Sequence, residues 1–242
     1  MGVGPARLLG TLRVLLFEPG RLSAESAAGT RGGHALGPVT LFVLCSAAFF
    51  VSVPVARLVD PDAPSIHVRT AADSAVMMLA DSAAFVGAPE VRENLVVRAV
   101  GAGRAWTLFT HQAVLEDIVA NAVPRAALLL LPLFALLTFL AWRGSGAGFG
   151  AHLTFALDVH SACFAALLVP ALLQPLHSTA VGVLGSLGVL VYTTWYVIAA
   201  GRRALGGTAR EVNLRMTVVG VLYAPVALAV TLGLALAAVR SL

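Results

Sequence analysis

Three ionisable residues stand out because they lie in a long uncharged part of the sequence. His152, Asp158 and His160 fall within residues 151–173, a helix-length apolar stretch. After Asp158, no Asp, Glu, Lys or Arg occurs before Arg202. A charged side chain at the centre of a bilayer costs about 2.5–3.5 kcal/mol, so such residues are usually functional or paired. The pattern predicts an intramembrane polar site.

Imidazole and carboxylate groups at membrane depth can carry protons, bind a metal ion or contact a polar ligand. The alternative is a structural network in which Asp158 is hydrogen-bonded to Ser, Thr or Tyr on a neighbouring helix. On a helix the two histidines are about 80° apart, and Asp158 is about 160° from His160. We therefore expect the histidines to face one cleft and Asp158 to face another helix.

A second group of polar residues lies in the stretch THQAVLED. His111 and Glu116 are five residues apart, which does not place them on one helical face, and Asp117 follows directly. The expected role of these residues is a solvated polar face. The alternative is a metal site or a substrate entrance on the outer side of the membrane.

Motifs for enzymes and cofactors are missing from the sequence. There is no nucleophile elbow, P-loop, GxGxxG or HExxH pattern. Two separated histidines also lack the usual tetrahedral ligand set of zinc. Cys45 and Cys163 lie in apolar runs without a CxxC pair, so we expect free thiols in helix packing. The prediction is a protein without catalytic residues, metal or cofactor.

Composition indicates a membrane protein. Of the 242 residues 59% are hydrophobic and only 12% are charged, against roughly 25% charged residues in soluble domains. The apolar runs are long and unbroken, whereas a β-barrel would show short alternating segments. The predicted fold class is therefore all-α, a polytopic helical membrane protein whose first partner is the lipid bilayer.

Five apolar segments are long enough to cross a bilayer of about 30 Å. The first is predicted at residues 36–57, and the other four form a bundle within residues 125–242. Within that bundle the spans are expected at residues 126–142, 151–173, 179–200 and 216–239. Ser178, Gly182 and Ser186 form a small-residue face of the fourth span that would permit close helix packing.

Two segments lie outside the predicted spans. Residues 1–35 are expected to form a cytoplasmic interfacial amphipathic helix, ended by Pro19 and Gly20 and followed by a polar linker over residues 21–33. Residues 58–124 carry eight acidic residues and four arginines, and they contain no run long enough to span. This region is predicted to be an extracytoplasmic helical segment, with short helices near residues 71–86, 90–100 and 105–122.

All 16 basic residues are arginines, and they are spread along the chain without a basic patch that would indicate a nucleic-acid partner. Their distribution predicts that the N-terminus is inside and the C-terminus outside, because the inner segments are rich in arginine. The predicted inner arginines are Arg7, Arg13, Arg21, Arg31, Arg143, Arg202, Arg203, Arg210 and Arg215. The arginine- and alanine-rich composition indicates a bacterial inner-membrane protein.

Several stretches together resemble a bacterial integral membrane family known as domain of unknown function 3667. They are LLFEPGR (residues 15–21), GPVTLFVLCSAAFF (37–50), LLLLPLFALLTFLAWR (128–143), AHLTFALDVHSACF (151–164) and VYTTWYVIAAGRRALG (191–206). The resemblance implies a membrane topology and no established activity. The order of segments is also similar, more coarsely, to Yip-type five-span proteins.

Two classes of function fit these observations. The first is a non-enzymatic membrane scaffold or accessory protein, or one that organises lipid or the cell envelope, with another membrane protein or a second copy as partner. The second is a small transporter or channel in which Asp158 and His160 line a polar cavity; prolines within the spans would provide broken helices. A membrane metal-dependent hydrolase is a third and weaker hypothesis.

Overall fold

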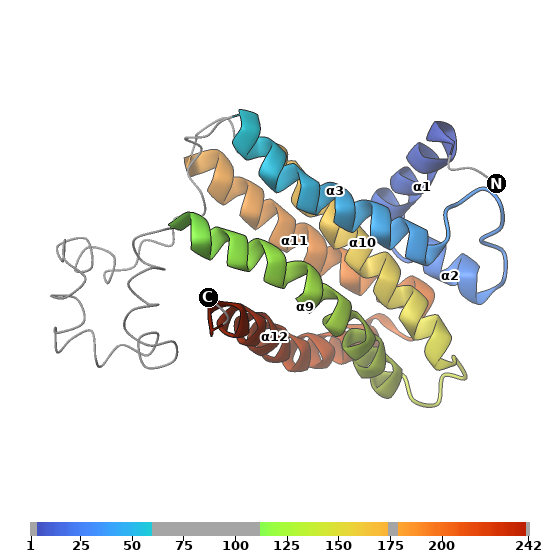
Figure 1. Ribbon diagram of the computed structural model, residues 1–242. Coiled ribbons are helices and arrows are strands. Elements are labelled where there is room, and N and C mark those ends of the chain that lie inside the picture. The colour runs from blue at the N-terminus through green and yellow to red at the C-terminus, as the bar shows by residue number, and fades with distance from the viewer. Residues whose placement is uncertain (1–3, 60–111, 174–178, 241–242) are drawn as a thin grey trace, which may run out of the picture. The chain divides into compact units, whose positions relative to one another are not determined.

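The computed structural model describes residues 4–59, 112–173 and 179–240. These residues form seven helices and no strand, in agreement with the predicted all-α class (Figure 1). In chain order the helices are α1 (Pro5–Phe17), α2 (Arg21–Ala27), α3 (Pro38–Val59), α9 (Gln112–Ala141), α10 (Phe149–Leu173), α11 (Thr179–Ala204) and α12 (Ala209–Arg240).

The chain divides into two compact units. The first contains Met1–Ala63 and Leu128–Pro225, and therefore the N-terminal helices, α3, α10 and α11. The second contains Pro64–Ala127 and Val226–Leu242, of which residues 112–127 and 226–240 are described and helical. The candidate site lies wholly within the first unit.

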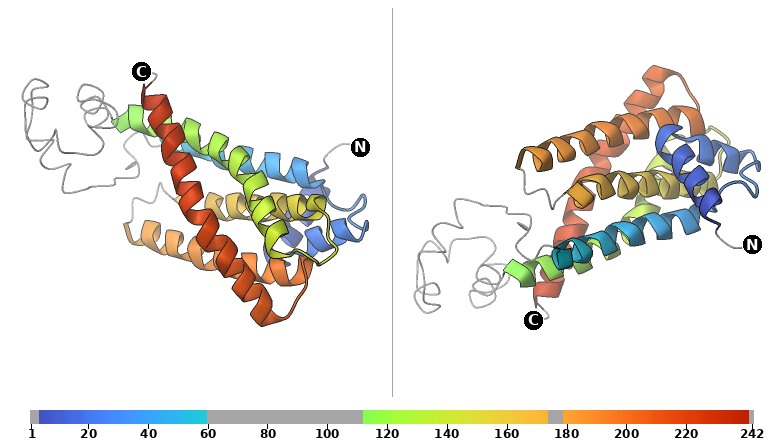
Figure 2. Two further views of the ribbon diagram at one scale, coloured as in Figure 1. Left: turned by 90° about the horizontal axis from the view of Figure 1, so that it is seen from below. Right: turned by 90° about the horizontal axis from the view of Figure 1, so that it is seen from above.

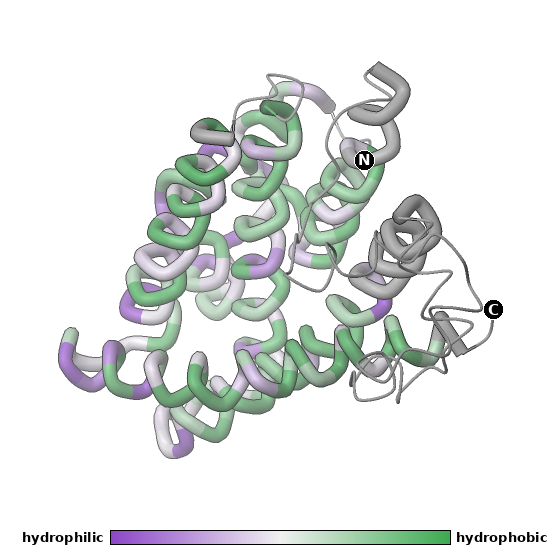
Figure 3. Tube along the Cα trace, turned by 90° about the vertical axis from the view of Figure 1, so that its left-hand side faces the viewer, coloured by the Kyte–Doolittle hydropathy of each residue, from purple (hydrophilic) through white to green (hydrophobic). Residues whose placement is uncertain are grey.

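Four helices contain a stretch that is long and apolar enough to cross a membrane, and their traces are mainly hydrophobic (Figure 3). The stretches are Pro124–Ala141, Phe149–Leu173, Val181–Ala204 and Ala209–Ala237. Four of the five predicted spans are thus supported by the length and composition of the helices. In α3 the described apolar stretch is shorter, Pro38–Ser52, so the first predicted span, at residues 36–57, stays a prediction.

Helix α10 is the centre of the first unit. It packs against α3 and against α11, and it lies between these two helices in both views of Figure 2. Phe155, Ala156 and Ala162 of α10 are completely buried. Phe164 of α10 also contacts three aromatic rings of α3, with ring centroids 5.4–5.9 Å apart. The residues of α10 thus form much of the core.

The N-terminal region differs from its prediction because it contains two helices. Pro5 starts α1 at a position where a missing N–H costs nothing. The chain then turns at Gly20, which has a φ of +75°, and α2 follows where a polar linker was predicted. The linker prediction was therefore wrong for residues 21–27, whereas residues 28–33 are non-helical as predicted. Leu22 and Ser23, which are both buried, show the reason: one face of this polar-looking segment packs against the bundle.

Other helices are longer than predicted. Residues 105–122 were expected to form a helix separate from the second span, but α9 runs without a break from Gln112 to Ala141. The predicted loop between the last two spans shrinks to four residues, 205–208. A capping box explains the early start of α12, because the Thr208 amide and hydroxyl both donate to the Glu211 carboxylate at 2.9 Å. The helices predicted near residues 71–86 and 90–100 lie outside the described residues.

The small-residue face predicted on the fourth span does not pack within the described chain. Gly182 and Ser186 are exposed, and Ser178 lies outside the described residues. The glycine that brings α11 close to α10 is Gly185, where an added Cβ would lie 3.2 Å from Cβ of Pro170. The close approach of α11 to α10 therefore occurs at Gly185, which is next in sequence to Ser186 of the predicted face.

Candidate functional site

Asp158 lies on α10 within a buried polar cluster. Its side chain accepts a hydrogen bond from the Ser23 hydroxyl at 2.7 Å. It also forms an ion pair with Arg31, whose Nη1 lies 3.0 Å from Oδ1 and 2.9 Å from Oδ2. Asp158 is only 2% exposed. The acidic group of α10 is therefore paired with a cation of the N-terminal segment and sealed from solvent.

Arg31 is nearly as buried as its partner and makes three kinds of contact. Its Nε donates to the Leu36 carbonyl at 3.0 Å, and its Nη1 donates to the Ser26 hydroxyl at 3.2 Å as well as to Asp158. Its Nη2 is buried without a hydrogen-bond partner in the described part of the chain. The guanidinium therefore links α2, the loop before α3 and α10 in one cluster.

Local structure after α2 sets the position of Arg31. Gly29 adopts a φ of +71°, as is common just after a helix end. The amides of Thr30 and Arg31 then donate to the Glu25 carbonyl at 2.7 and 3.2 Å. This tight turn reverses the chain, so that the arginine side chain is directed back toward the bundle.

Further contacts fix the N-terminal helices to the same end of α10 and α11. The Tyr192 hydroxyl of α11 donates to the Leu16 carbonyl at 2.8 Å. Gly20 lies so close to α11 that an added Cβ would be 2.5 Å from the Ala200 carbonyl oxygen. The Leu36 amide donates to the Thr11 hydroxyl at 3.1 Å, which connects α1 to the loop before α3. We call α1, α2 and residues 28–37 the N-terminal platform.

His160 faces away from Asp158, as its helical spacing predicts. Its Nδ1 lies 2.8 Å from the Ala156 carbonyl and its Nε2 lies 3.0 Å from the Tyr223 hydroxyl. Because a carbonyl only accepts, Nδ1 is the donor, and in the neutral ring Nε2 accepts from the tyrosine. The ring also makes an edge contact with Phe134, with centroids 5.5 Å apart. His160 therefore belongs to a satisfied packing contact.

His152 shares the α9-facing side of α10 with His160 but has different surroundings. The residue is fully buried, and neither ring nitrogen has a hydrogen-bond partner among the described residues. Its ring lies edge-on to Phe139 of α9, with centroids 5.6 Å apart. The structure thus separates the three residues of the predicted site into an ion pair, an aromatic contact with hydrogen bonds and an unpartnered imidazole.

The structure describes little of the second predicted site. His111 lies outside the described residues, whereas Glu116 and Asp117 fall on α9, where only the backbone is described. Within the described ranges, no group of three His, Cys, Asp or Glu side chains is placed to hold a metal ion. Cys45 and Cys163 are both free thiols.

The exposed side of α2 carries a small network of ion pairs. Arg21 donates to Glu18 at 2.8 Å and to Glu25 at 2.7 Å, and these two hydrogen bonds raise the pKa of Arg21. The hydrogen bond from Arg21 lowers the pKa of Glu25; His34, 3.2 Å away, acts in the same direction, and partial burial opposes both. The network stabilises the turn between α1 and α2.

Sequence reasoning missed Ser23, Arg31 and Tyr223 as parts of the site. The first two stand in a segment of Ser, Gly and Arg that looks like a solvated linker, and Tyr223 lies in an apolar run. One signal was available: a buried acid is usually paired with a cation, and the predicted spans contain only Arg57, at the outer end of the first span. An inner arginine outside the spans was therefore the natural partner, but eight others were equally eligible.

Comparison of the chain with family models, curated proteins and solved structures gives no match. The resemblance to the bacterial membrane family therefore stays a prediction. The geometry of the described residues is the basis for a function.

Proposed function

We propose that this protein is a non-enzymatic scaffold of the bacterial inner membrane that organises lipid or a partner membrane protein around a rigid N-terminal platform. The observation that carries the proposal is the sealed pair of Asp158 and Arg31, with exposures of 2% and 7%. The ionisable group at membrane depth is used to fix the platform to the bundle, which is a structural use.

Energetics support a holding role for this pair. Removing one partner of a buried ion pair leaves an unpaired buried charge and costs about 3–5 kcal/mol. Replacing both partners with apolar residues of similar volume is often neutral or stabilising. The pair is therefore expected to specify where the platform docks. An apolar contact in its place is expected to hold the platform equally well without the charges.

The alternative, a transporter or channel, requires Asp158 and His160 to line a polar cavity. The contacts of both residues favour the scaffold instead, because Arg31 and Ser23 cover the carboxylate and Tyr223 covers Nε2 of His160. We therefore rank transport below the scaffold.

The proposed orientation places the platform on the cytoplasmic side. Arginine counting predicts that side for the N-terminus and for the loops after α9 and α11. In the first unit the platform packs on the early part of α10 and the late part of α11, which is consistent with one side for all of these segments. The C-terminus is then proposed to lie outside, and the partner is another membrane protein or a second copy.

The test compares Asp158→Leu with the double variant Arg31→Met/Asp158→Leu. If the ion pair serves only to hold the platform, the double variant keeps the scaffold function. The single variant loses this function because its platform no longer docks on the bundle. The readout is stoichiometric copurification of a membrane partner, or of a second copy, from mild detergent. Arg13→Gln, which changes an exposed platform arginine, is the matched control.

Two results would contradict the scaffold. One is a stably folded double variant that no longer moves protons or ions across proteoliposomes while the wild type does, because this result would assign transport to the charges. The other, which contradicts the partner-binding form of the scaffold, is a wild-type protein that purifies from several hosts as a monomer without any partner.

A further inference from the structure

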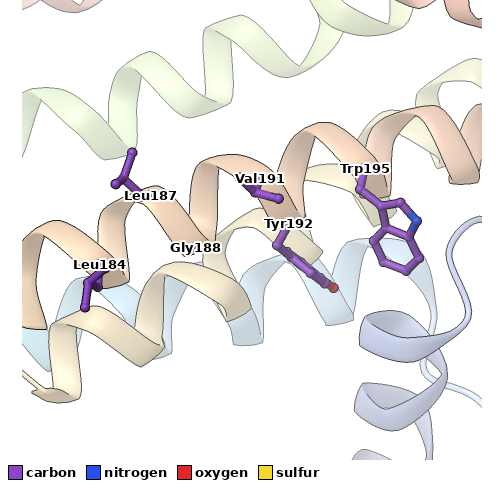
Figure 4. Close-up of a pocket in the computed structure, with 6 residues that line it drawn as sticks. All are labelled: Leu184, Leu187, Gly188, Val191, Tyr192 and Trp195. Carbon is purple, nitrogen blue, oxygen red and sulfur yellow. The ribbon is translucent and has the colours of Figure 1, made fainter.

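The outer surface of α11 carries a shallow groove of about 520 Å³ (Figure 4). It is lined by Leu184, Leu187, Gly188, Val191, Tyr192 and Trp195. Gly188 has no side chain and therefore leaves a notch between its neighbours, and this notch is open because a Cβ added there would meet no atom within 4 Å. Trp195, at one end of the groove, is 51% exposed. The groove is open to whatever surrounds the helix.

The groove suits hydrocarbon rather than a polar ligand. Its lining is almost entirely carbon, and the one hydroxyl there, on Tyr192, already donates to the Leu16 carbonyl. From Leu184 to Trp195 the helix rises about 16 Å. This length is about half of a hydrocarbon core of roughly 30 Å, so the groove has the length of one leaflet.

The cationic side chain of Arg202 lies beyond the end of the groove that Trp195 lines, on the same side of the helix. Arg202 follows Trp195 by seven residues, which returns it to within about 20° of the same face and raises it about 10 Å. Its side chain is exposed, and no hydrogen bond or ion pair holds it among the described residues. Tryptophan is enriched at the membrane–water interface, and a long arginine side chain reaches the headgroup level.

We propose that this groove binds one acyl chain of an anionic phospholipid, with the headgroup phosphate at Arg202. The chain lies over Gly188 between Leu184 and Trp195, in the leaflet on the side of the N-terminal platform. This inference rests on the proposed membrane residence and names the lipid class that the scaffold would organise. Arg203 also complements the negative end of the helix dipole, but it lies about 100° around the helix from Arg202.

Tryptophan quenching by brominated lipids tests the proposal on the full chain. The protein is placed in phosphatidylcholine vesicles in which either phosphatidylglycerol or phosphatidylcholine carries the brominated chains. The signal of Trp195 is the difference between wild type and Trp195→Phe, which retains Trp106 and Trp142. We expect half-maximal quenching at a fraction of brominated phosphatidylglycerol that is about fivefold lower than the fraction of brominated phosphatidylcholine needed. An attraction of about 1 kcal/mol between one arginine and an anionic lipid corresponds to this ratio.

Two pairs of variants locate the site. Arg202→Gln should remove the preference for phosphatidylglycerol, whereas Arg203→Gln should keep it. Gly188→Leu should fill the notch and weaken quenching by both lipids. Gly182→Leu should leave quenching unchanged, because Gly182 is also exposed on α11 but lies outside the groove.

Three results would overturn the lipid site. Equal quenching of wild type by the two brominated lipids would make this an ordinary lipid-facing surface. A preference that survives both Arg202→Gln and Gly188→Leu would place the lipid elsewhere. Absence of quenching, together with dimer cross-linking through Gly188→Cys, would show that a second copy covers the groove. All three readouts use purified protein, so they are independent of the partner test of the scaffold.

Discussion

Helices α10 and α11 are both apolar enough to cross a membrane, yet they occupy opposite environments. Within an 18-residue apolar window of α10, 44% of the residues are buried in the protein, whereas in the corresponding window of α11 only 6% are. The buried polar residues of α10 are His152, Asp158 and Ser161. The outer face of α11 carries leucine, valine and glycine, with its hydroxyl groups concentrated toward one end.

The difference shows what drives burial when lipid is the surrounding solvent. Leucine and valine gain little by leaving lipid for a protein interior, because both environments are apolar. Polar groups gain much more, because they find hydrogen bonds only inside the protein. Polar residues therefore select α10 as the central helix, and α11 can present its apolar surface to lipid.

The largest expected effect breaks the polar contact of α10. Asp158→Leu should lower the free energy of unfolding by about 3–5 kcal/mol, because Arg31 is left buried without a counter-charge. Urea unfolding in detergent, followed by circular dichroism, measures the change. The double variant Arg31→Met/Asp158→Leu should return close to the wild-type value, and Leu190→Ala on the outer face of α11 should change it by less than about 0.5 kcal/mol. A double variant as unstable as the single one would contradict this account.

A smaller effect is expected where the platform meets α11. Gly20→Ala should cost about 1–3 kcal/mol, because Gly20 has a φ of +75° and the new Cβ would overlap the Ala200 carbonyl. The thermal midpoint in detergent measures the loss. Gly182→Ala is the matched control on the exposed face, where better helix propensity should stabilise by up to about 1 kcal/mol. Equal effects of the two changes would mean that the platform does not pack on α11.

Tyr192→Phe sharpens the comparison within α11 itself. The change removes the hydrogen bond to the Leu16 carbonyl and should cost about 0.5–1.5 kcal/mol. Hydrogen exchange of the amides in α1 and α2 should rise in this variant, because the platform opens more often. Trp195→Phe, on the exposed side of the same helix, should leave exchange in the platform unchanged. Faster exchange in both variants would indicate a general weakening of α11.

The smallest effect concerns the exposed ion pairs of the platform. The pKa of Glu25 is lowered in the folded state, so its contribution to stability is fully present above the ordinary value of 4.5 and is lost as pH falls through the folded-state pKa. Glu25→Gln should therefore lower the thermal midpoint near pH 7, and the difference from wild type should vanish in acid. Exposed pairs contribute about 0–1 kcal/mol, so the shift should be small. A difference that grows in acid would have the wrong sign.

Much of the fold follows from local sequence patterns. Long uncharged runs predicted the four membrane-compatible stretches, and most of the predicted ends lie within a few residues of the observed ends. The reason is that length and apolarity alone decide which segments suit a bilayer. Helix boundaries were less accurate. Arg202, Arg203 and Arg210 looked like loop residues but lie in the last turn of α11 and the first turn of α12.

The candidate site was predictable only in part. The position and cost of Asp158 could be derived from the uncharged chain around it, and the angular separation from the histidines followed from helix geometry. Its partner could not be derived, because Arg31 is 127 residues away and no local rule connects the two. The prediction of a linker in place of α2 failed for the same reason.

The sequence by itself determined that the chain is helical, that it has long apolar helices and that one carries a costly acid. These properties depend on composition and on the periodicity of neighbouring residues. Only the tertiary structure decided that Ser23 and Arg31 satisfy this acid, that α10 is central and that α11 keeps an apolar face outside. Those outcomes depend on which distant groups meet in space, because a buried charge is stabilised by its partner and not by its own segment.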